Sequence, residues 1–259
     1  MVMGDGNFDL GRVFGQTLGV TARHFLPLFL LAMFFYGIPY ALILALPSAV
    51  YGGLIAIPPE YRVWLPLAGG FVVYLSALVL QGALTRAAVD ALSGKGVNLG
   101  AALGAGFRFM FPLLGLGLLM GIAIGLGLLL LIIPGLYLMV RYSVSSPALI
   151  MEDLGITGAM ERSRDLTAGH RWPIFGLLLV YGALTYGLGI ALARFGGTLD
   201  HIANGVAIFA GIPVVTIIVT SAIEVALRII GTIGTASIYF ELRRADEGVD
   251  VSQLASVFE

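Results

Sequence analysis

Three charged side chains stand inside long apolar stretches of the sequence, where a charge is costly to place. Arg141 lies within residues 109–151, and Glu224 and Arg228 lie within residues 202–240. On a helix, Glu224 and Arg228 are one turn apart and share a face. At about 1.5 Å of rise per residue, Arg141 and Glu224 reach similar depths in a membrane, which predicts that these two side chains contact each other.

Two interpretations of these charges stay open. One is a structural ion pair that locks two helices together, and the other is a polar cavity for a lipid headgroup, an ion or an anionic substrate. Pro147 leaves a carbonyl near Ser143 without its helical donor, and nearby serine hydroxyls can satisfy it. A hydrated kink is therefore expected beside Arg141. The candidate ligand-binding residues are Arg141, Glu224, Arg228, Ser143 and Ser145.

The remaining residue types do not indicate catalysis or a cofactor. Cysteine is absent, Lys95 is the only lysine, and the three histidines lie at predicted membrane borders, so no nucleophile has a base in reach. No cluster of His, Asp and Glu has metal-ligand spacing. A net charge of −1 provides no basic surface for nucleic acid. We expect no enzyme, no metal site, no cofactor and no nucleic-acid partner.

Composition places the chain in a membrane. Of its 259 residues, 59% are apolar and 11% are charged, and the mean hydropathy is +0.99. Soluble domains carry about 25% charged residues. We therefore expect an all-α, polytopic helical bundle with a single membrane domain over residues 1–240 and a cytoplasmic C-terminal tail over 241–259.

Six apolar stretches are long enough, or nearly so, to cross the bilayer. The predicted spans are residues 25–46, 64–84, 109–132, 136–151, 174–192 and 216–239. The third and fourth are separated at Ile133-Pro134-Gly135, because Pro and Gly interrupt helices. Residues 200–216 are expected to form a short segment at the outer interface. Most of the 14 Lys and Arg residues fall on one side of these spans, which predicts that both termini are cytoplasmic.

A weak internal repeat precedes three of the spans. Each copy is a short amphipathic stretch that ends in basic and aromatic residues before a proline, which predicts three interfacial helices on the cytoplasmic side. The predicted interface anchors are Arg23, Arg108, Arg171 and Trp172, and the prolines are Pro27, Pro112 and Pro173. Basic and aromatic residues at span entries are also common in any membrane protein, so the repeat has this simpler explanation too.

Small residues recur at helical spacing in the third span. Gly117, Gly121 and Gly125 are spaced by four, which lets helix backbones approach closely. The stripe could pack inside the bundle or form the face of a homo-oligomer.

Three motifs together resemble a known family. They are Ile133-Pro134-Gly135-Leu136-Tyr137 with Arg141 and Pro147-Ala148-Leu149, the run from Gly158 to Thr167 into Gly169-His170-Arg171-Trp172, and the tail from Tyr239 to Arg243 followed by Glu247-Gly248-Val249-Asp250. The chain resembles the membrane domain associated with glycerophosphoryl diester phosphodiesterases and its stand-alone, YciC-like relatives. The resemblance implies a multi-pass protein of the bacterial inner membrane.

The resemblance does not bring the phosphodiesterase activity with it. In the fused relatives that activity resides in a separate metal-dependent barrel, and such a barrel needs about 250 residues. Here His170-Arg171 stands at a membrane entry, and only 87 residues follow Trp172. The leading hypothesis is a non-enzymatic membrane protein that binds lipid, a membrane protein partner or a second copy of itself. The alternative is a small-molecule permease that uses a polar site around Arg141 and Glu224.

Overall fold

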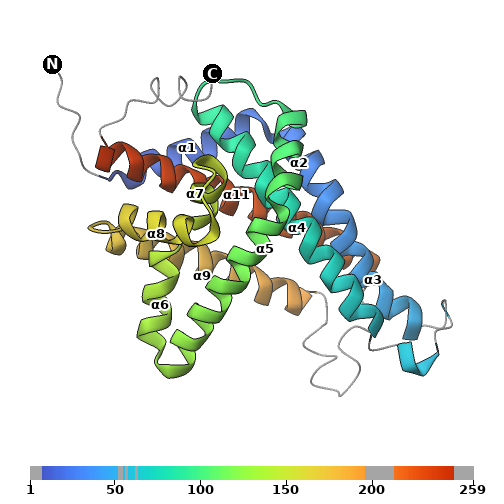
Figure 1. The fold of residues 1–259 in the computed structure, drawn as a ribbon. Helices are drawn as coiled ribbons and strands as arrows, with labels where there is room; N and C mark the ends of the chain where they lie inside the picture. Colours follow the sequence, from blue (N-terminus) through green and yellow to red (C-terminus); the bar gives the residue numbers. More distant parts are fainter. Residues whose placement is uncertain (1–7, 52–54, 56–57, 62–63, 196–212, 248–259) are drawn as a thin grey trace. The chain divides into compact units, whose positions relative to one another are not determined.

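The computed structural model describes residues 8–51, 55, 58–61, 64–195 and 213–247. Within these residues the fold is entirely helical (Figure 1). The elements are α1 (Leu10–Arg23), α2 (Phe25–Ala32), the π-helix η1 (Met33–Gly37), α3 (Ile38–Tyr51), the 3-10 turn η2 (Pro59–Tyr61), α4 (Trp64–Leu92), α5 (Leu99–Leu130), α6 (Ile132–Arg141), α7 (Ser145–Met151), α8 (Ile156–Leu166), α9 (Arg171–Phe195) and α11 (Val214–Glu247).

Five helical segments are long and apolar enough to cross a membrane, which confirms the all-α class. They are Phe25–Leu46, Trp64–Leu92, Leu99–Leu130, Arg171–Arg194 and Val214–Asp246.

The expected single domain divides into two compact units. The first contains Met1–Leu28, Leu78–Leu179 and Ile229–Glu259, and the second contains Phe29–Ala77 and Val180–Arg228. The boundaries fall within α2, α4, α9 and α11.

Helix α1 of the first unit is amphipathic. Asp9 caps its N-terminus by accepting hydrogen bonds from the backbone N–H groups of Gly11 (2.8 Å) and Arg12 (3.4 Å). One face buries Val13, Thr17 and Val20, while Leu10, Phe14 and Leu18 stay exposed. An exposed apolar stripe on a separate helix beside a span fits the predicted interfacial position.

The fourth predicted span, 136–151, was wrong as a single helix. Its residues form the second half of α6 and all of α7, with a turn at residues 142–144 between them. At 1.5 Å per residue α6 is only about 15 Å long, half the thickness of the hydrocarbon core. Pro147 has no N–H to donate to the carbonyl of Ser143, and the turn lies at this position, where a kink was expected.

The break before α6 also lies earlier than expected. The chain turns at Leu131, which has extended φ and ψ angles of −160° and 142°, while Pro134 lies in the first turn of α6. A first-turn residue donates no intrahelical hydrogen bond, so proline fits there. Gly135 permits the return of the chain, because a Cβ added at Gly135 would lie 2.7 Å from the backbone nitrogen of Leu128.

The second copy of the repeat departs from the expected pattern. Pro27 and Pro173 lie in the first turns of α2 and α9, but Pro112 lies inside α5, which runs unbroken from the predicted interfacial stretch through the span. Only two of the three expected interfacial helices, α1 and α8, are therefore separate elements. A single interior proline removes one backbone hydrogen bond, and the rest of this long apolar helix outweighs that loss.

The Gly117, Gly121 and Gly125 stripe does not pack inside the described part of the first unit. All three glycines are exposed, and a Cβ added at Gly121 or Gly125 would meet no atom within 4 Å. The close helix contact is made instead by Gly82 of α4 and Gly106 of α5. A Cβ on Gly82 would lie 2.8 Å from the Cα atom of Gly106, and a Cβ on Gly106 would clash with the carbonyl oxygen of Val79.

The second unit contains a π-helix whose position follows from the sequence. Pro39 has no N–H to donate to the carbonyl of Phe35, and the N–H of Ile38 bonds instead to the carbonyl of Met33, five residues back. Gly37 closes this π-turn against α11, because a Cβ there would lie 2.9 Å from Cγ2 of Val225.

Helix α11 is longer than the predicted sixth span. It continues to Glu247, so the beginning of the expected tail is helical and the buried side chain of Glu241 belongs to the first unit. Residues 248–259 and most of the expected outer segment 200–216 lie outside the described residues.

Candidate functional site

The three predicted intramembrane charges belong to different units. Arg141 ends α6 in the first unit, whereas Glu224 and Arg228 lie on α11 in the second unit. The expected contact between Arg141 and Glu224 therefore stays a prediction.

The backbone of Arg141 is anchored to α8. Its carbonyl accepts hydrogen bonds from the hydroxyls of Ser163 (2.9 Å) and Thr167 (3.4 Å), and both of these side chains are buried. Its guanidinium lies 5.5 Å from the ring centroid of Tyr142. The turn at residues 142–144 leaves the carbonyl of Arg141 without a helical hydrogen bond. The hydroxyls of Ser163 and Thr167 supply hydrogen bonds to this carbonyl instead.

The serines that follow Arg141 are held in different ways. The hydroxyl of Ser143 donates to the carbonyl of Val140 (2.8 Å), and Gln81 donates to the hydroxyl of Ser146 (3.0 Å). The buried hydroxyl of Ser145 has no hydrogen-bond partner in residues 8–195 and 213–247 as far as the structure describes them. The described contacts of these serines are with a backbone carbonyl and an amide.

Arg228 is the centre of an aromatic and polar cluster in the second unit. Its guanidinium carbon lies 3.8 Å from the ring centroid of Tyr36, which is on the π-helix. Tyr36 in turn stacks on Tyr40 with centroids 5.3 Å apart and ring planes 12° apart. A cation over an aromatic face is stabilised by the ring quadrupole, most strongly away from water. The Nε atom of Arg228 is buried and has no hydrogen-bond partner among the residues that the structure describes.

Three helices bring this cluster together at similar depth. The hydroxyl of Tyr181 on α9 donates to the carbonyl of Leu227 on α11 (2.9 Å), next to Arg228. At 1.5 Å per residue, Tyr36 lies about 16 Å from the start of its span, Tyr181 about 15 Å from the start of α9 and Arg228 about 21 Å from the start of α11. Each position is near the middle of a hydrocarbon core about 30 Å thick.

Two further polar residues lie on the Arg228 face of α11. Glu224 is half-buried and within electrostatic range of Tyr36, Tyr40 and Tyr181. Ser221 is buried, and within the described part of the chain its hydroxyl has no hydrogen-bond partner. The ion pairs of the described residues do not join Glu224 to Arg228. We call Tyr36, Tyr40, Tyr181, Ser221, Glu224 and Arg228 the tyrosine–arginine site.

A shallow groove begins one helical turn from Tyr181. It lies on α9, encloses about 470 Å³ and is mostly apolar. Its lining residues are Thr185, Tyr186, Gly189, Ile190 and Ala193. Thr185, Gly189 and Ala193 continue the four-residue row that starts at Tyr181, so the groove extends along the side of α9 that carries the site.

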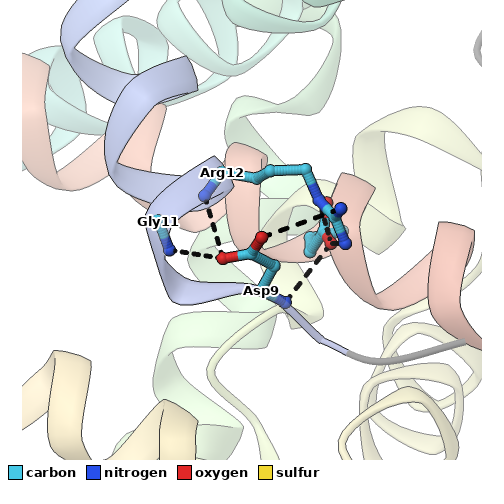
Figure 2. Close-up of polar contacts among 4 residues, drawn as sticks. Asp9, Gly11 and Arg12 are labelled. Atoms are coloured by element: carbon cyan, nitrogen blue, oxygen red, sulfur yellow. Dashed lines mark hydrogen bonds and ion pairs between the residues drawn. The ribbon is translucent and has the colours of Figure 1, made fainter. Parts of the chain in front are cut away.

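A second polar cluster joins the ends of the sequence in the first unit. Arg12 of α1 lies 2.6 Å from Oε1 of Glu241 on α11, and the Glu241 side chain is only 1% exposed. Figure 2 shows Asp9 beside Arg12, where its carboxylate caps α1 and also lies 3.7 Å from the guanidinium. The other carboxylate oxygen of Glu241 is buried, and none of the described residues donates a hydrogen bond to it. This Arg12–Glu241 clasp fixes α1 to α11.

A third set of contacts joins α11 to the segment between α7 and α8. The hydroxyl of Tyr239 donates to Oε1 of Glu152 (2.6 Å) and lies 3.5 Å from Arg243, and Nε of Arg162 is 2.9 and 3.0 Å from the two oxygens of Glu152. On the exposed face of α8, the hydrogen bond that Arg164 donates to the carboxylate of Asp165 (2.8 Å) raises the pKa of Arg164 above its ordinary value.

Replacing Tyr239 with phenylalanine is expected to lower the free energy of unfolding by about 2 kcal/mol, since it removes a buried hydrogen bond to a charged group. Unfolding measured in mixed micelles checks this value. Tyr137→Phe is the matched control, because Tyr137 is exposed and is contacted through its ring by Arg171 at 4.9 Å. Equal losses in the two variants would contradict the assigned role of the Tyr239 hydroxyl.

The predicted interface anchors occupy varied surroundings. Arg23 and Trp172 are exposed, and Trp172 is 83% exposed. Arg108 pairs with Asp153 (2.6 Å), and Arg171 lies over the ring of Tyr137. Exposed Trp and Arg side chains at the starts of apolar helices suit a lipid interface.

Within the described residues, no group of three or more His, Cys, Asp or Glu side chains could hold a metal ion. Comparisons of the chain with family models, curated protein sequences and solved structures find no match. The resemblance to the phosphodiesterase-associated membrane domain stays a prediction.

Proposed function

We propose that this protein is a non-enzymatic membrane protein that binds a phospholipid, with the phosphate at Arg228. The observation that carries this proposal is the guanidinium of Arg228, held against Tyr36 among apolar helices with its Nε–H unused. A guanidinium presents planar N–H donors that match phosphate oxygens. The unpartnered hydroxyl of Ser221 supplies a further donor on the same face.

The groove on α9 supports a lipid rather than a free phosphate as the ligand. It starts one turn from Tyr181, and its lining is mostly apolar, as an acyl chain requires. In the predicted topology α9 runs from the cytoplasmic side outward, so a headgroup held at Arg228 would lie deep in the membrane with an acyl chain directed outward along α9. We further propose location in a bacterial inner membrane with both termini cytoplasmic, as charge distribution and the family resemblance predict.

Titration of delipidated protein with a fluorescent, phosphate-bearing lipid tests the proposal. Arg228→Gln is expected to weaken binding at least about tenfold, because a charge-assisted contact away from water is lost. Arg141→Gln is the matched control, since it removes the other intramembrane arginine and leaves the tyrosine–arginine site intact. Unchanged binding in Arg228→Gln, or a loss in Arg141→Gln alone, would contradict the proposal.

A further inference from the structure

We propose that the tyrosine–arginine site selects a zwitterionic headgroup with a primary ammonium, of the phosphoethanolamine type, and that Glu224 determines this selectivity. The inference rests on the proposed function, because it takes the phosphate to be held at Arg228. It adds a second subsite, at Glu224, for the positive end of the same headgroup.

The spacing of the two charges fits such a headgroup. Glu224 and Arg228 lie one turn apart on one face of α11, yet the ion pairs of the described residues do not join them. Side chains at this spacing are about 5–6 Å apart at their Cβ atoms. The phosphorus and nitrogen atoms of phosphoethanolamine are separated by one oxygen and two carbons, a comparable span. One headgroup can therefore contact both side chains.

Charge balance separates zwitterionic from anionic headgroups. The carboxylate of Glu224 and the guanidinium of Arg228 together carry no net charge. A zwitterion keeps that balance, whereas an anionic headgroup adds an unpaired negative charge close to Glu224. In a weakly polar environment such a charge is strongly disfavoured.

Hydrogen-bond chemistry separates a primary ammonium from a quaternary one. A primary ammonium has three N–H donors, and the side chain of Glu224, one turn from Arg228 on the same face of α11, offers acceptor oxygens. A quaternary ammonium has no N–H and is recognised by free aromatic faces. Here Tyr36 already carries Arg228 over its ring and stacks on Tyr40. The site therefore offers an acceptor for N–H groups rather than an aromatic cage.

The test compares lipids of identical acyl chains whose headgroups are phosphoethanolamine, its mono- and dimethylated forms, phosphocholine and phosphoglycerol, in nanodiscs that hold the wild-type protein. Phosphoethanolamine is expected to bind about tenfold more tightly than phosphoglycerol or phosphocholine, with affinity falling as methyl groups are added. Glu224→Gln is expected to abolish this preference while Arg228-dependent binding persists. Glu224→Asp should retain the preference, and Glu60→Gln, at an exposed carboxylate of η2, should change nothing.

The outcomes separate the two proposals. Binding that depends on Arg228 but is equal for all headgroups overturns the selectivity and leaves the proposed function standing. Binding that does not depend on Arg228 overturns the proposed function itself. If Glu224→Gln does not fold, the series of methylated headgroups on the wild-type protein still tests the selectivity. An affinity that does not change as N–H groups are replaced by methyl groups contradicts a carboxylate subsite for the ammonium.

Discussion

Replacing Arg12 with alanine is expected to lower the free energy of unfolding by about 3 kcal/mol. The substitution leaves the Glu241 carboxylate buried at 1% exposure without the guanidinium that now lies 2.6 Å from it. Removing one partner of a buried ion pair costs far more than the pair itself contributes, because the remaining charge has lost both water and its counter-ion. Unfolding in mixed micelles, followed by circular dichroism, measures the change.

Two controls isolate the clasp from a general loss of a cation. Arg23→Ala removes an exposed arginine from the last turn of the same helix and should cost less than about 1 kcal/mol. In a Glu241→Leu background, Arg12→Ala should cost little, because no buried carboxylate remains. If Arg12→Ala costs the same in both backgrounds, the two residues are not coupled and α1 is held by its apolar face alone.

Replacing Gly106 with alanine is expected to destabilise the protein by about 2–3 kcal/mol. The added Cβ would clash with the carbonyl oxygen of Val79, and backbone atoms cannot move aside as a flexible side chain can. The α4–α5 contact in the first unit would therefore have to separate. Thermal unfolding in detergent should show this as a clear fall in Tm.

The same substitution two residues earlier should have the opposite sign. Gly104 lies in α5 with no atom within 4 Å of an added Cβ, so Gly104→Ala should stabilise the helix by about 0.5–1 kcal/mol. Similar effects at the two positions would show that helix propensity, rather than the close approach of α4 and α5, determines the response.

Hydropathy predicts the five long apolar helices well, because a segment that crosses a bilayer needs a continuous apolar length regardless of its neighbours. Hydropathy fails where contacts with neighbouring segments determine whether a helix continues or ends. Residues 136–151 have the composition of a span, but Ser163 of α8 and Thr167, the residue that follows α8, supply the hydrogen bonds that let the chain turn after Arg141. The sequence around Pro112 predicts the start of a helix, yet α5 continues through this residue.

The candidate site was predictable only in part. Charges inside apolar stretches identify Glu224 and Arg228 directly, because their cost is visible in one sequence. Tyr36, Tyr40 and Tyr181 carry no such signal, since tyrosine is an ordinary residue of membrane helices. The nearest clue is Tyr36-Gly37-Ile38-Pro39-Tyr40, because Pro39 cannot donate a helical hydrogen bond to the carbonyl of Phe35, at the place where the π-turn forms. The Arg12–Glu241 clasp joins opposite ends of the chain, and no local pattern marks that pairing.

The measurement that tests the central claim most directly is mass spectrometry of lipids retained when the protein is extracted with its surrounding bilayer. The wild-type protein is expected to retain one phospholipid class above its proportion in the membrane, and Arg228→Gln is expected to lose this enrichment while Arg141→Gln keeps it. A retained lipid profile that matches the bulk membrane in all three proteins would contradict a phospholipid site at Arg228.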